Sequence, residues 1–206
     1  FLISTNTPGV SALQLQKQLG HGRHETTFML LHKIRNALVD PERTKLEGEV
    51  EVNEFFVGGP EPGHPGRGAV EKTECVIGGE VRRWEEVGKD GKSKKRIRAG
   101  RVRLKTVPNA KAETLLPWIQ ENLQAGSLVV TDGLVSYKRL PSLGYHHTTM
   151  VPNREGYLPM AHLVVSNLKA WLLGTYHGAV RGEHLQAYLN EYAFRFNRRF
   201  WRGPAF

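Results

Sequence analysis

Residues 46–59, LEGEVEVNEFFVGG, decide how the rest of the chain is interpreted. Between positions 49 and 53 valines alternate with glutamate and asparagine, and this two-residue period predicts a half-buried strand. Gly58-Gly59 ends the strand and opens a loop rich in glycine and proline. Glu49, Glu51 and Asn53 would then share one face of the strand, where carboxylate and amide oxygens can bind a metal ion.

The composition favours a globular, nucleic-acid-binding protein. The chain of 206 residues is long enough for one main domain with a small appendage. A formal net charge of +9 and a pI near 9.8 favour a polyanionic partner, and a basic solvated surface is the alternative. The single cysteine, Cys75, excludes an internal disulfide and a thiolate-rich zinc site within this chain. No apolar run approaches the roughly 18 residues of a membrane span and the start is not signal-like, so we expect a cytoplasmic protein.

Residues 9–39 predict two short helices joined by a glycine turn. Ser11 is the expected N-cap of the first helix, and a threonine at 26–27 is the expected cap of the second. A second helix that carries Lys33 and Arg35 is typical of a helix-turn-helix that contacts DNA. A helical hairpin that binds nothing is the alternative. Because the chain starts with Phe rather than Met, we expect it to be a piece of a longer protein.

Two further strands, 74–87 and 96–107, are predicted to form a hairpin around a loop rich in Gly, Lys and Ser. This hairpin is the most basic part of the chain. Contact with phosphates is the favoured interpretation, and a solvated edge protected by lysines is the alternative. The hairpin residues expected to contact DNA are Arg82, Arg83, Lys94, Lys95, Arg96 and Arg98.

The second half of the chain predicts an α/β domain. The expected elements are a helix at 111–123, an apolar strand at 127–131, a short helical turn at 136–140, a strand at 145–151 and helices at 161–175 and 183–198. Three strands, a helix, a strand, a short helix, a strand and two helices suggest a mixed sheet covered by helices.

Three side chains in this half are candidates for chemistry. Asp132 follows an apolar strand and precedes Gly133, so it is expected in the crevice where open α/β sheets bind ligands, and an ordinary Asp-Gly turn is the alternative. His162 and Lys169 are seven residues apart and share one face of the predicted helix. A metal-binding group beside an ammonium that holds phosphate suits a phosphodiester site, and two solvated side chains are the alternative.

Four motifs carry a family resemblance: VEVNEFFVGG at 50–59, VVTDGLVSY at 129–137, HLVVSNLKAWLLGTYHG at 162–178 and HLQAYLNEYAFRFNRR at 184–199. They resemble DDE-type insertion-sequence transposases of the ISXO-like group, and the resemblance covers about residues 9–206. It implies a ribonuclease-H-like catalytic domain, similar to retroviral integrase, at 43–206. A helix-turn-helix-like DNA-binding segment and linker would occupy 1–42.

The resemblance also implies roles for individual residues. Asn53 falls on the first catalytic Asp position and Asp132 on the second; His162 falls on the third, which is Glu in many members and His or Asn in some. Lys169 falls on the lysine seven residues later, a further expected DNA contact. The first three positions would hold two Mg²⁺ (or Mn²⁺) ions, which activate water or a 3′-hydroxyl and stabilise the leaving oxygen. The implied partners are double-stranded DNA, at element ends and target, and further copies of the chain in a prokaryotic nucleoid.

Asn53 departs from this pattern. Mg²⁺ prefers carboxylate oxygens, and Asp132 is the only carboxylate of the three positions. Glu51 shares the strand face of Asn53 but is displaced by about 7 Å, and Glu54 is expected on the other face. We therefore expect a transposase impaired at its first ligand, and a catalytically dead, transposase-derived DNA-binding protein is the alternative.

Overall fold

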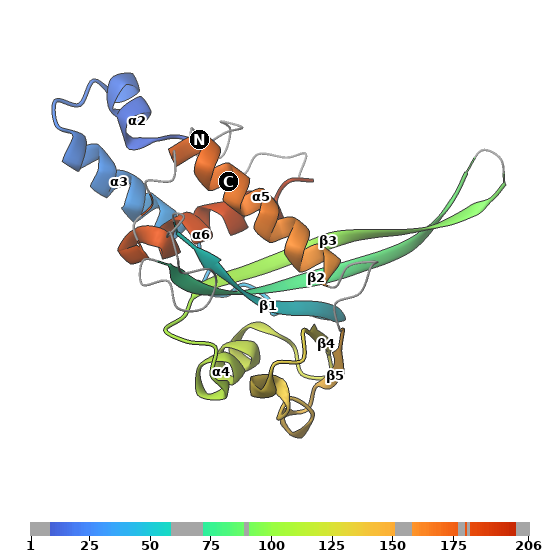
Figure 1. Cartoon of the computed structure of the whole chain (residues 1–206). Helices are drawn as coiled ribbons and strands as arrows, with labels where there is room; N and C mark the ends of the chain where they lie inside the picture. Colours follow the sequence, from blue (N-terminus) through green and yellow to red (C-terminus); the bar gives the residue numbers. More distant parts are fainter. Residues whose placement is uncertain are drawn as a thin grey trace, which may run out of the picture. The chain divides into compact units, whose positions relative to one another are not determined.

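The computed structural model describes residues 9–58, 72–88, 91–150, 158–176, 180 and 182–200 (Figure 1). In chain order its elements are α2 (Ala12–Leu19), α3 (His24–Ala37), β1 (Glu49–Val57), β2 (Thr73–Val87), β3 (Ser93–Thr106), α4 (Ala112–Asn122), β4 (Leu128–Thr131), the 3₁₀ turns η1 (Val135–Tyr137) and η2 (Pro141–Leu143), β5 (His146–Thr149), α5 (Pro159–Tyr176) and α6 (Gly182–Asn197). This order confirms the sequence of strands and helices expected from periodicity.

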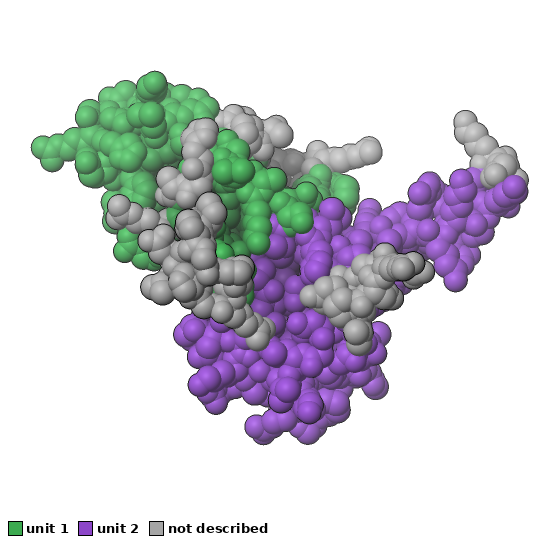
Figure 2. Space-filling model, in the orientation of Figure 1, with its two compact units in different colours: residues 1–43, 56–73, 166–206 green, residues 44–55, 74–165 purple. Residues whose placement is uncertain are grey.

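The chain forms two compact units (Figure 2). Unit 1 comprises residues 1–43, 56–73 and 166–206, and unit 2 comprises residues 44–55 and 74–165. The N-terminal helices therefore share a unit with α6. The division of function between residues 1–42 and 43–206 stays a prediction.

The sheet has five strands in the order β3-β2-β1-β4-β5. β4 pairs in parallel with both β1 and β5, whereas β2 and β3 are antiparallel. A mixed sheet of this order with flanking helices is ribonuclease-H-like, so the predicted fold class is confirmed.

The two faces of β1 have different roles in unit 2. Val50 and Val52 are buried in a core cluster with Trp118 and Ile119 of α4 and Val129 of β4. Burial of side chains of this size contributes about 1.5–3 kcal/mol each, which holds α4 on this face. Because side chains alternate along a strand, the odd-numbered residues of β1 point to the opposite face. That face carries the candidate site.

The helical pair of unit 1 has one cap as expected and one that differs. The hydroxyl of Ser11 accepts a hydrogen bond from the Gln14 N–H at 3.2 Å, as predicted. The predicted cap of α3 at 26–27 is wrong, because the helix begins at His24. Thr27 is buried inside α3, and its hydroxyl is hydrogen-bonded to Nδ1 of His21 at 3.1 Å. Among the described residues no helix is long and apolar enough to cross a membrane.

Candidate active site

The register between two parallel strands places the first two predicted site residues side by side. Glu49, Val50 and Glu51 of β1 are level with Leu128, Val129 and Val130 of β4. Continuing this register by two residues brings Asn53 level with Asp132. Neighbouring strands lie about 4.8 Å apart, so this register predicts that both side chains reach one bound group.

Asp132 lies in a tight turn directly after β4. Its Oδ1 accepts the Leu134 N–H at 3.0 Å, and Gly133 adopts a left-handed conformation with φ +87°. The Thr131 hydroxyl accepts the Gly133 N–H at 3.2 Å and is hydrogen-bonded to Nε2 of His147, whose pKa is lowered by burial. Asp132 therefore forms an Asp-Gly turn, and this turn holds its half-buried carboxylate at the end of β4.

Glu51 connects β1 to the start of α5. Its side chain is buried, and Oε2 accepts the Ala161 N–H at 2.7 Å. The first residue of α5 is Pro159, which has no N–H, so the next N–H groups need an acceptor. Burial raises the pKa of the Glu51 carboxyl, and hydrogen bonds from the backbone of Ala161 and Met160 oppose that rise. The negative group also interacts favourably with the positive end of the helix dipole.

This contact holds the start of α5, where the third predicted residue lies, against β1. His162 directly follows Ala161, its side chain is exposed, and its N–H donates to the Leu158 carbonyl at 3.0 Å. Leu158 is buried with a left-handed φ of 45°, a strained conformation for a leucine that typically costs about 1–3 kcal/mol. From the sequence Glu51 was considered only as a substitute ligand, and its contact with α5 was missed because 110 residues separate it from Ala161.

Glu54 lies on the opposite face, as expected. The Tyr137 hydroxyl donates to its Oε1, and Tyr137 belongs to the core cluster of Val50 and Val52. Glu54 therefore does not substitute for the missing carboxylate.

The donor set does not fit a Mg²⁺ site as it stands. Asn53 is only 7% exposed and supplies a neutral amide, so Asp132 is the one carboxylate among the three predicted ligand positions. Hard divalent cations are usually bound through one or two carboxylates with further oxygens. In the part of the chain that the structure describes, no three His, Cys, Asp or Glu side chains are grouped to hold a metal ion. Lys169 is exposed on the part of α5 that belongs to unit 1, so its role beside this site stays a prediction from spacing.

Arg35 is not available for DNA, which corrects one predicted contact. Its side chain is 1% exposed, and Nε donates to Oε2 of Glu191 at 2.7 Å. The guanidinium also lies over the Tyr188 ring at 4.3 Å and donates to the Tyr176 hydroxyl at 3.1 Å. These contacts link α3 to α6 within unit 1. Lys33 is exposed on α3 and stays a candidate for DNA contact.

The basic hairpin residues differ in how far they are paired with carboxylates. Arg83 donates two hydrogen bonds to Glu49, at 2.8 and 2.6 Å. Arg82 pairs with Glu80 at 2.9 Å, and Arg96 pairs with Glu86 at 2.6 Å. Lys94, Lys95 and Arg98 are exposed cations of the hairpin, and the Arg98 guanidinium lies over the Trp84 ring at 5.2 Å.

The mixed sheet of order β3-β2-β1-β4-β5 with flanking helices defines a ribonuclease-H-like α/β fold, with Asn53 inside β1 and Asp132 directly after β4. Residues 45–197 match the family described as ISXO2-like transposase domain, which is most of the chain. The chain therefore belongs to the ISXO2-like transposase family.

No curated protein matches the chain. Among solved structures, one chain of the cryo-EM structure of the simian T-cell lymphotropic virus intasome in complex with PP2A regulatory subunit B56 gamma is similar at 10% sequence identity and a TM-score of 0.36. The similarity covers 89% of this chain but only 65% of that chain. A similarity of this size supports no conclusion about function.

Proposed function

We propose that this chain is a DNA transposase of an insertion sequence whose strand-cleavage centre is impaired by Asn53. The observation that carries the proposal is the register of β1 and β4, in which Glu51 is level with Val130; Asn53 and Asp132 each follow two residues later. Membership of the ISXO2-like transposase family supports cleavage and joining of double-stranded DNA at element ends as the reaction. The working form is expected to be an assembly of several copies on paired ends.

The impairment follows from charge. An amide oxygen at position 53 can coordinate a cation but does not neutralise its charge, and Asp132 alone is a weak site for a hard divalent ion. An aspartate at position 53 would restore a second carboxylate level with the first. Mg²⁺ (or Mn²⁺) is the cofactor that we propose for this restored form, with Asp132, His162 and residue 53 as its ligands.

Asn53 also favours a second candidate function, that of a catalytically inactive DNA-binding protein derived from a transposase. The exposed cations of the hairpin and Lys33 would then serve binding alone. The two candidates differ in what happens when the carboxylate is restored.

Cleavage and joining of element-end DNA in the presence of Mg²⁺ or Mn²⁺ would separate the two, with this chain compared with its Asn53→Asp variant. We expect products only from Asn53→Asp. Asp132→Ala in the Asn53→Asp background is the control, and it should abolish cleavage while circular dichroism stays unchanged. No products from either form, with DNA binding intact, would favour the inactive binding protein. Cleavage that survives Asp132→Ala would show that the site is wrongly assigned.

A further inference from the structure

The outer halves of β2 and β3 form a two-stranded ribbon that extends beyond the rest of the sheet (Figure 1). We define the ribbon as residues 82–87 paired with residues 93–98. Every side chain in it is exposed. An isolated two-stranded hairpin is marginally stable in water, so a ribbon that exposes both faces is well suited to being covered by a partner.

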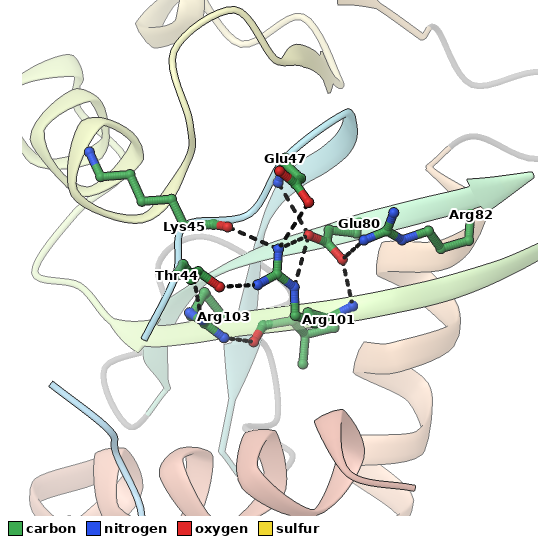
Figure 3. Close-up of polar contacts among 8 residues, drawn as sticks. Thr44, Lys45, Glu47, Glu80, Arg82, Arg101 and Arg103 are labelled. Atoms are coloured by element: carbon green, nitrogen blue, oxygen red, sulfur yellow. Dashed lines mark hydrogen bonds and ion pairs between the residues drawn. The ribbon is translucent and has the colours of Figure 1, made fainter. Parts of the chain in front are cut away.

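The base of the ribbon is fixed by a buried carboxylate (Figure 3). The ladder shifts register between Gly79 and Val81, and Glu80 lies at this bulge with 0% exposure. Its Oε1 accepts the Glu47 N–H at 3.2 Å and the Arg101 Nε–H at 3.0 Å, and its Oε2 accepts from Arg82 at 2.9 Å. A bulge of this kind increases the local twist and redirects the strands.

The charge of Glu80 is stabilised in place. Burial would raise the pKa of its carboxyl, but the side chain and backbone of Arg101 and the backbone of Glu47 donate hydrogen bonds, and the net pKa is lowered. Gly100 allows this packing, since a Cβ there would lie 2.8 Å from Cβ of Glu80. The ribbon therefore leaves the sheet from a rigid base.

The two faces of the ribbon differ in charge. Residues paired directly across an antiparallel ladder share a face. The pairs Arg82–Arg98, Trp84–Arg96 and Glu86–Lys94 make up one face, which we call the basic face. The pairs Arg83–Ile97, Glu85–Lys95 and Val87–Ser93 make up the opposite face.

The basic face combines cations with an aromatic ring. It carries four cations and one carboxylate, whereas the opposite face carries two cations, one carboxylate and the apolar Val87 and Ile97. Arg83 of the opposite face is bound to Glu49, and on the basic face Arg82 is bound to Glu80 and Arg96 to Glu86. On the basic face the Arg98 guanidinium lies 5.2 Å from the centre of the Trp84 ring, which is 42% exposed.

We propose that the basic face of the ribbon is a docking surface for double-stranded DNA. The inference rests on the proposed function and adds to it which face of the hairpin meets the DNA. A two-stranded β-ribbon fits the major groove of B-DNA, and the cations of this face match the charge of the phosphates that border it. Lys94 and Arg98 contact phosphates, and Trp84 lies against the sugar-phosphate wall with Arg98 held over its ring.

Two neighbouring lysines provide a matched test. Lys94 and Lys95 are adjacent on β3, both exposed and on opposite faces, so Lys94→Ala and Lys95→Ala remove the same charge from opposite sides. Binding of a fluorescein-labelled duplex is measured by fluorescence anisotropy from low to physiological salt. Lys94→Ala is expected to raise Kd about threefold or more and to reduce the slope of log Kd against log salt by about 1. Lys95→Ala should leave that slope unchanged.

The outcomes distinguish the docking face from the function on which it rests. If the unaltered chain binds DNA with a salt dependence but the two lysine variants have equal effects, the assignment of the basic face is wrong and the proposed function still stands. No DNA binding by the unaltered chain would overturn the proposed function. Trp84→Ala should weaken DNA binding. If it instead changed the sedimentation of the free protein and left DNA binding intact, the face would be a contact between copies, and the proposal would fail.

Discussion

Glu51 shows how a single buried charge can organise the candidate site. Its carboxylate lies on the same strand face as Asn53 and accepts the Ala161 N–H, one residue before His162. An unpaired buried N–H costs about 1–3 kcal/mol, so the contact stabilises the first turn of α5. The same burial disfavours the ionised carboxyl, which is why its pKa is raised.

We expect Glu51→Ala to lower the free energy of unfolding by about 1–3 kcal/mol, because the N–H groups of Met160 and Ala161 lose their acceptor. Glu51→Gln keeps an acceptor and carries no charge. A raised pKa in the folded state means that the stability contributed by Glu51 is present below its unfolded pKa and is lost as pH rises through the folded pKa. The Gln variant should therefore gain stability relative to the unaltered chain between pH 4 and pH 7. Urea unfolding at the two pH values measures this, and a constant difference would contradict it.

The Glu80 cluster adds polar contacts between the strand pair β2–β3 and the segment before β1, beside the pairing of β2 with β1 in the sheet. Arg101 links Glu80 to the segment before β1, where its guanidinium donates to the Lys45 carbonyl at 2.9 Å. Arg103, which is 7% exposed, donates to the Thr44 carbonyl at 2.9 Å. The hairpin and the start of β1 are thus held by the same group of polar contacts, although they are far apart in the chain.

Glu80→Ala should destabilise the protein by about 2–4 kcal/mol, because it removes the buried carboxylate that accepts hydrogen bonds from Arg101 and Arg82. Arg101 is 30% exposed, so we place the effect below that of a fully buried pair. Glu86→Ala is the matched control: this residue lies on the same strand, pairs with Arg96 and is 55% exposed, and its loss should cost less than about 1 kcal/mol. Chemical denaturation of both variants measures the difference, and equal losses would show that the cluster does not anchor the hairpin.

The chain as a whole carries a net charge of +9, which favours its proposed binding to the negatively charged phosphates of DNA. Each phosphate neutralised by a lysine or arginine releases about one counterion. The logarithm of Kd should therefore rise linearly with the logarithm of the salt concentration. We expect DNA affinity to decrease by a factor of about 10 to 1,000 between 50 and 200 mM salt, for roughly two to six phosphate contacts. Filter binding or anisotropy across this range tests it. A flat response would rule out the polyanionic partner.

Local sequence patterns were enough for the order of the elements. The alternating pattern of β1 and the apolar run of β4 each follow from which faces of that one strand are buried. Neighbouring residues are enough to show such a pattern. The cap of α3 was misplaced because Thr27 is buried and contacts His21, a preference that a cap rule does not include.

The candidate site could be predicted only in part. Family motifs pointed to Asn53, Asp132 and His162, and the strand register supports the placement of the first two beside each other. The engagement of Glu51 by α5 could not be read from spacing, because 110 residues separate it from Ala161. That contact forms only when the helix packs on the sheet.

The amino-acid sequence alone therefore determined the element order, the family and the absence of a carboxylate at position 53, since these depend on residue identity and local periodicity. The tertiary structure decided which charged side chains are exposed and could contact DNA. Arg35 forms a buried ion pair with Glu191, 156 residues away, whereas Lys94 and Lys95 are exposed on opposite sides of one strand. Whether a charged side chain can contact DNA depends on its burial and on its ion pairs, and both arise from contacts between residues that are far apart in the chain.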